Sequence, residues 1–102
     1  MTTKEEFDQI YTERGPIIAI FTAEGWCGPC NSLVQKIERM TKEFENIPVV
    51  FVNIDESPDL TEEWGVAGLP ATLAIQKDGS VTGNVVGDRA YLVRKLFESL
   101  GN

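Results

Sequence analysis

The chain has 102 residues, of which 42% are hydrophobic and 25% are charged. This composition is typical of one folded domain spanning residues 1–102 and argues against intrinsic disorder. Nine Lys and Arg residues against sixteen Asp and Glu residues give a net charge of −7, which disfavours binding to nucleic acid or to an anionic membrane. The absence of His excludes the usual Ser-His-Asp and Cys-His hydrolases and most zinc enzymes.

The first half of the chain predicts a helix, a strand, a second helix and a second strand. Thr3 and Glu6 have the spacing of a capping box, which predicts that the first helix begins there. The short apolar segments 16–22 and 48–54 are typical of buried strands. Segment 28–46 carries apolar residues at helical spacing. Because a helix connects them, the two strands are expected to be parallel.

The second half predicts a short helix, a hairpin and a final helix. Ser57 and Pro58 mark the start of the short helix. Segments 71–77 and 81–87 are expected to pair as antiparallel strands across a glycine-containing turn. Asp88 is expected to cap the last helix. The predicted fold class is therefore α/β, with a four-stranded mixed sheet that carries helices on both faces.

Cys27 and Cys30, which are the two cysteines of the chain, lie between the first strand and the long helix. Unpaired N–H groups and the dipole at a helix start favour a thiolate at Cys27. Cys30 comes one turn later and is expected to point inward. This asymmetry predicts that Cys27 attacks a substrate disulfide and that Cys30 resolves the mixed disulfide by attacking Cys27.

Three interpretations of the cysteine pair compete. A structural disulfide across so short a loop would remove little chain entropy. A zinc site needs about four ligands, so two thiolates and no His could complete one only in a symmetric dimer, and we expect no metal. A redox-active dithiol is the favoured interpretation, because a C-x-x-C pair beside a strand–helix–strand unit is typical of that chemistry.

Four stretches of the sequence resemble the thioredoxin family, in the same order along the chain. They are Trp26-Cys-Gly-Pro-Cys30, Val52-Asn-Ile-Asp55, Gly65-Val-Ala-Gly-Leu-Pro-Ala71 and Lys77-Asp-Gly79 with Val86-Gly87 after it. The resemblance covers nearly the whole chain. It implies a thioredoxin-like fold and a protein-disulfide reductase without a bound cofactor. It also implies disulfide-containing client proteins as partners, and electrons that come from NADPH through thioredoxin reductase.

The resemblance also implies a docking surface for client proteins. Pro70 matches the cis-proline of the family, so the Leu69–Pro70 bond is expected to be cis and its loop to face the cysteines. The expected docking residues surround the cysteines: Trp26, Gly28, Pro29, Leu69, Pro70 and Gly87. Trp26 as an ordinary core residue and Pro70 as an ordinary loop proline are the alternatives.

Two departures from the family pattern affect the fold and the chemistry. The first strand of the family is expected to be absent, which leaves segment 48–54 at an edge of the sheet. The protein is expected to be a monomer that self-associates weakly through this apolar edge. The buried Asp and Lys of the family fall at Ile20 or Phe21 and at Phe51, so we expect slower thiol exchange and a simpler pH dependence. Glu24 could replace the carboxylate, although solvent as the base is the simpler interpretation.

Other functions and surface roles stay open at this stage. A disulfide oxidase or isomerase, or a binding or assembly module independent of redox state, could use the same fold. The polar, acidic N-terminal segment shows no secretory signal, so the cytoplasm is the expected location. An acidic run is expected to be a solvated helix face or a patch for a basic partner: Asp55, Glu56, Asp59, Glu62 and Glu63.

Overall fold

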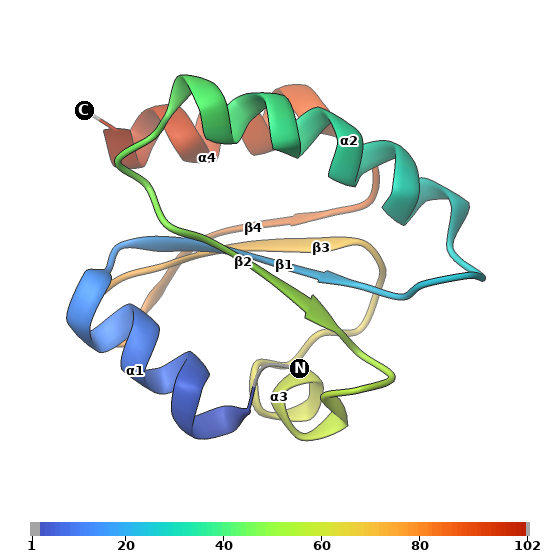
Figure 1. The fold of residues 1–102 in the computed structure, drawn as a ribbon, viewed down its shortest axis with the longest axis horizontal. Coiled ribbons are helices and arrows are strands. Elements are labelled where there is room, and N and C mark those ends of the chain that lie inside the picture. The colour runs from blue at the N-terminus through green and yellow to red at the C-terminus, as the bar shows by residue number, and fades with distance from the viewer. Residues whose placement is uncertain (1–2, 102) are drawn as a thin grey trace.

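The computed structural model describes residues 3–101, and its element order agrees with the prediction (Figure 1). The elements are α1 (Lys4–Arg14), β1 (Ile17–Thr22), α2 (Gly28–Glu43), β2 (Val49–Asn53), α3 (Pro58–Glu63), β3 (Ala71–Ile75), β4 (Val81–Val86) and α4 (Ala90–Gly101). In this part of the chain, no helix is long and apolar enough to cross a membrane.

The strands form one mixed sheet in the order β2-β1-β3-β4. β1 and β2 are parallel, as expected for strands joined by a helix, whereas β3 is antiparallel to both β1 and β4. The four-stranded prediction is confirmed within residues 3–101, and β2 lies at an edge. The β1–β2 register pairs Ile20, one of the two positions expected for the Asp of the family pattern, with Phe51, the position expected for its Lys.

Helices cover both faces of the sheet, with α2 and α4 on one side and α1 and α3 on the other (Figure 1). Helices are needed on both faces because the first five residues of β1 are fully buried. Its alternate side chains belong to two separate cores. Ile17, Ala19 and Phe21 pack on the α1 and α3 side. Ile18 and Ile20 pack against α2 and α4.

Helix α1 is held at its start by a cap and at its centre by aromatic packing. The Glu6 N–H donates to the Thr3 hydroxyl at 3.1 Å, which confirms the predicted helix start. The buried Phe7 ring lies 5.5 Å from that of Trp64 and 6.3 Å from that of Phe21. Phe7 therefore joins α1 to the sheet and to the end of α3.

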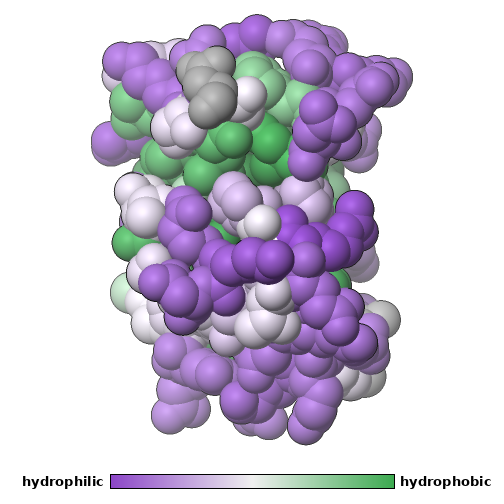
Figure 2. Space-filling model, turned by 90° about the vertical axis from the view of Figure 1, so that its left-hand side faces the viewer, coloured by the Kyte–Doolittle hydropathy of each residue, from purple (hydrophilic) through white to green (hydrophobic). Residues whose placement is uncertain are grey.

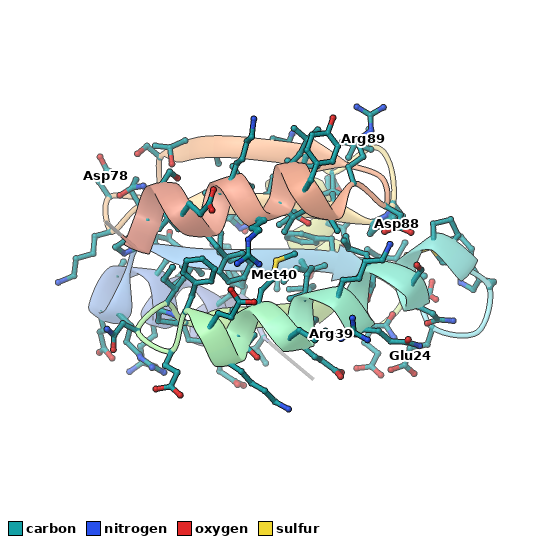
Figure 3. The ribbon with its side chains drawn as sticks, turned by 90° about the horizontal axis from the view of Figure 1, so that it is seen from above. Glu24, Arg39, Met40, Asp78, Asp88 and Arg89 are labelled. Carbon is teal, nitrogen blue, oxygen red and sulfur yellow. A yellow bond between two sulfur atoms is a disulfide. The ribbon has the colours of Figure 1, made fainter. Side chains whose placement is uncertain are left out.

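Helices α2 and α4 lie side by side, with Met40 between them (Figure 3). The Phe44 and Phe97 rings are 5.5 Å apart, and Arg94 pairs with Glu43 across the helices. That ion pair lowers the pKa of Glu43, mainly through its hydrogen bond from Arg94. The prediction placed the end of the long helix at residue 46, but α2 ends at Glu43.

The end of the molecule opposite the cysteines carries a band of hydrophobic surface framed by hydrophilic residues (Figure 2). Phe44 and Leu100, near the ends of α2 and α4, are half-buried and pack against the α2–α4 core. A small hollow of about 120 Å³ beside Phe44 and Ile47 is also bordered by Glu43 and Glu45. The Phe44 and Leu100 side chains close the α2–α4 core at the end of the molecule where both helices finish.

The packing of Phe7 predicts a large stability effect. Truncation of this fully buried ring in Phe7→Ala should lower the free energy of unfolding by about 3–5 kcal/mol, because it removes apolar contacts and leaves a cavity. Tyr91→Ala, which truncates a 69% exposed ring, should change it by only about 0.5 kcal/mol. Guanidinium unfolding measures both, and equal effects would contradict this account of α1.

Self-association through β2 stays a prediction that the edge position makes testable. Phe51 on this strand is 41% exposed, and β2 pairs with β1 on one side alone. Sedimentation equilibrium should show a weak dimer at high protein concentration, and Phe51→Lys should abolish it because a charged edge resists pairing. A wild-type protein that stays monomeric at every concentration would refute the prediction.

Candidate active site

Cys27 and Cys30 form a disulfide at the start of α2. Their Cα atoms are 5.2 Å apart. Cys27 is the N-cap residue of the helix, and its Sγ accepts the Cys30 N–H at 3.2 Å. Cys27 is 8% exposed and Cys30 only 1%. The sulfur nearer the surface is thus the one held by a helix N–H, which is the environment that favours a thiolate.

Trp26 stands in solvent beside the disulfide and is anchored at one point. Its side chain is 63% exposed, so the alternative that it is a core residue is wrong. The indole N–H donates to the Asp55 carboxylate at 3.0 Å. Asp55 follows β2, and its own N–H donates to the Asn53 side chain at 2.9 Å. The Trp26–Asp55 bond therefore connects the loop before α2 with the loop after β2.

The loop before β3 approaches the cysteines from the other side. The Leu69–Pro70 peptide bond is cis. The carbonyl of the buried Pro70 accepts the Gly87 N–H at 2.8 Å. A Cβ atom on Gly68 would lie only 2.8 Å from Cγ1 of Val86, so a side chain at this position would press on β4. The loop before β3 and the end of β4 are in this way held together.

A groove of about 480 Å³ runs beside the disulfide. Trp26, Cys27 and Pro29 form one side of it, and residues 66–69 form the other. Ile54 and Thr61 also line it. Three of the six docking residues expected from the sequence therefore share one groove with Cys27, namely Trp26, Pro29 and Leu69. Gly28, Pro70 and Gly87 are not part of its lining.

Asp88 does not have the role that its position in the sequence predicts. Helix α4 begins at Ala90, so Asp88 lies one residue too early to be its cap. Its carboxylate points toward α2 (Figure 3) and lies 3.3 Å from the Lys36 ammonium. Hydrogen bonds from Ser32 and Lys36 lower the pKa of Asp88. The capping prediction was wrong because α4 begins later than expected, and the carboxylate pairs with a side chain of α2.

The interior behind the cysteines holds no carboxylate in the described part of the chain. Ile20 is fully buried, and none of the Asp and Glu side chains in residues 3–101 is buried. Glu24 lies on the outer side of the loop that leads into α2 (Figure 3). With Glu38 and Phe51 it borders a surface hollow of about 270 Å³. A carboxylate in this solvent-exposed position is poorly placed to serve the buried Cys30.

The acidic run around α3 contains two residues with identified partners. Asp55 accepts from Trp26, and Glu63 lies 3.3 Å from the ammonium of Lys4. Asp59 and Glu62 are exposed. A solvated helix face accounts for these positions, and recognition of a basic partner stays a prediction. The described residues contain no cluster of three or more His, Cys, Asp or Glu side chains that could hold a metal.

Sequence reasoning missed one buried polar residue of the sheet. Thr72 on β3 is fully buried, and its hydroxyl has no hydrogen-bond partner among residues 3–101. Its only signal in the sequence is a polar residue inside the apolar segment Ala71–Ile75. That signal is weak, because Thr is common in strands and often lies on an exposed face.

Known proteins resemble the chain over almost its full length. The family model described as Thioredoxin matches residues 1–98. The thioredoxin of Chlamydia caviae is 35% identical over 98 residues, which is 94% of this chain and 93% of that protein. The thioredoxin of Rhodospirillum rubrum is 40% identical over 85 residues, covering 82% of this chain and 78% of that one.

Solved structures agree with the sequence comparisons. Plasmodium falciparum thioredoxin superposes with a TM-score of 0.89 at 27% identity, covering 97% of this chain and 95% of that chain. The oxidised mitochondrial thioredoxin 3 of Saccharomyces cerevisiae gives a TM-score of 0.89 at 26% identity, covering 98% of this chain and 92% of that one. The chain therefore belongs to the thioredoxin family of thiol–disulfide oxidoreductases.

Proposed function

We propose that this chain reduces the disulfides of client proteins, with Cys27 as the nucleophile and Cys30 as the resolving residue. The observation that carries the assignment is the unequal setting of the two sulfurs. Cys27 caps α2 and borders the groove, whereas Cys30 is almost fully buried behind it. Only the first of them can meet a sulfur atom of another protein without a rearrangement of the helix.

The reaction consists of two successive thiol–disulfide exchanges. The Cys27 thiolate attacks one sulfur of the client disulfide, and the other client sulfur leaves as a thiolate. Cys30 then gives its proton to solvent and attacks Cys27 Sγ. This attack forms the Cys27–Cys30 disulfide and expels the second client thiolate. The client gains two electrons, and the chain loses two.

The client segment is proposed to lie across the groove and its rim. Trp26, Pro29 and Leu69 offer apolar contact beside Cys27, and Gly28 leaves open space in front of the helix start. Pro70 and Gly87, joined by their backbone hydrogen bond, hold the opposite rim in place. Residues 1–102 are proposed to act as a single domain in this reaction.

The cycle needs an electron donor that restores the dithiol. We infer thioredoxin reductase with NADPH as that donor, because membership of the thioredoxin family implies this electron source. The cytoplasm is the proposed location, since a reducing compartment keeps the cysteines available as thiols. An oxidase or isomerase would show a less negative reduction potential. A redox-independent binding module would keep its biological activity after both cysteines are replaced by Ser.

The reductase assignment predicts NADPH-dependent reduction of insulin disulfides in the presence of thioredoxin reductase. Cys27→Ser should lower turnover to the rate without the chain, because the attacking thiolate is lost. Cys30→Ser should instead accumulate a mixed disulfide with insulin, which mass spectrometry detects. Activity with dithiothreitol alone would indicate a different electron donor. Absence of activity with both donors would refute the reductase assignment.

The apolar interior behind the cysteines predicts a simple pH dependence. The reduction rate should rise with pH as the Cys27 thiol ionises, since the thiolate is the reactive form, and then level off. One ionisation should describe the whole curve, because residues 3–101 place no buried carboxylate beside Cys30. A second inflection in the acid range that disappears in Glu24→Gln would contradict this prediction and identify Glu24 as a base.

A further inference from the structure

Thr72 is an unusual residue for the interior of this sheet. It is 0% exposed, and its hydroxyl has no hydrogen-bond partner in residues 3–101. An unpaired hydroxyl in an apolar interior is costly, and such groups are uncommon in folded proteins. A Val at this position would have nearly the same shape without that cost. The retained hydroxyl therefore calls for an explanation beyond packing.

Strand alternation places the Thr72 side chain on the α2 and α4 side of the sheet. Its neighbours Ala71 and Leu73 belong to the core on the α1 and α3 side. Ala74 belongs to the opposite core, together with residues of α2 and α4. Side chains at positions two apart share a face, so Thr72 points to the same side as Ala74. On that face its register partner on β1 is Ile20.

Cys30 lies on α2, the helix whose other buried residues pack on this face of the sheet. The buried residues of α2 form one stripe, which begins with Cys30 and continues through Leu33, Ile37 and Met40. Helix α2 starts at the end of the sheet where β1 stops and β3 begins (Figure 1). Thr72 is the first β3 residue on the α2 face from that end, and Cys30 is the first buried residue of α2. The Thr72 hydroxyl and the Cys30 sulfur therefore belong to the same end of the sheet, on the face that α2 covers.

We propose that the Thr72 hydroxyl is a positioning residue for the resolving step and donates a hydrogen bond to the Cys30 thiolate. In the disulfide, Cys30 Sγ is uncharged and a weak acceptor. In the mixed disulfide, Cys30 must become an anion among apolar side chains such as Ala23 and Leu69. A buried neutral donor stabilises that anion. This inference rests on the proposed reductase function.

In this resolving step the Thr72 hydroxyl only donates a hydrogen bond, and atoms and charges balance without it. Thr72 keeps its proton throughout, and the Cys30 proton goes to solvent. The Cys30–Cys27 bond forms as the Cys27–client bond breaks, and the client sulfur leaves with the electron pair. Within residues 3–101 the other buried polar side chain is Ser57, which lies at the start of α3 on the opposite side of the sheet. Thr72 is accordingly the available donor on the α2 face.

The reaction of the reduced protein with 5,5′-dithiobis(2-nitrobenzoate) separates the two exchange steps. Attack by Cys27 releases one coloured thiolate at a rate that depends on reagent concentration. Attack by Cys30 on the adduct releases a second thiolate at a rate that does not. Stopped-flow absorbance should show the second phase slowed about tenfold in Thr72→Val, with the first phase unchanged. Thr72→Ser, which keeps the hydroxyl, should restore the second phase.

Two controls separate this role from damage to the fold. Thr82→Val makes the same chemical change on an exposed residue of β4 and should leave both phases unchanged. Thr72→Val should be at least as stable as the wild type in the oxidised state, because it removes an unpaired polar group. An unchanged second phase in Thr72→Val, or equal slowing in Thr72→Ser, would overturn the inference. Absence of both phases in the wild type would instead refute the proposed function.

Discussion

The burial of β1 on both faces is the constraint on which the rest of the structure depends. The strand contacts α1 and α3 through one set of side chains and α2 and α4 through the other. It therefore lies inside the sheet, with β2 and β3 as its neighbours. Because α2 begins soon after this strand ends, the helix start and its capping sulfur lie at one end of the sheet. The place where β1 ends therefore determines where the reactive Cys27 lies.

Backbone geometry, more than charge, shapes the site. The Cys27 sulfur accepts a helix N–H, and the Pro70 carbonyl accepts the Gly87 N–H. Trp26 and Asp55 supply the side-chain bond that joins the remaining loop. The last two contacts join loops that belong to different strands at the same end of the sheet. A chain with a net charge of −7 can in this way favour a thiolate without a basic residue next to the cysteine.

Local patterns in the sequence were enough to predict the element order and the cysteine pair. The Thr3 cap depends on residues three positions apart, and the apolar strands carry their own signal. The capping role of Asp88 was predicted wrongly, because α4 begins at Ala90 and the Asp88 carboxylate pairs instead with Lys36, which is 52 positions away. The burial of the Thr72 hydroxyl could not be predicted for a related reason. It depends on which sheet face α2 covers, and periodicity within one strand does not specify that.

Apolar residues at Ile20 or Phe21 and at Phe51, where the family pattern has a buried Asp and Lys, change the balance between stability and proton transfer. A buried carboxylate carries a desolvation cost, and an apolar pair avoids it. The same change removes a base from the neighbourhood of Cys30, so its proton must leave by way of solvent. A buried hydroxyl avoids the desolvation cost of a carboxylate and can still donate a hydrogen bond to Cys30. It stabilises the Cys30 thiolate without ionising itself, so it adds no second titration to the reaction.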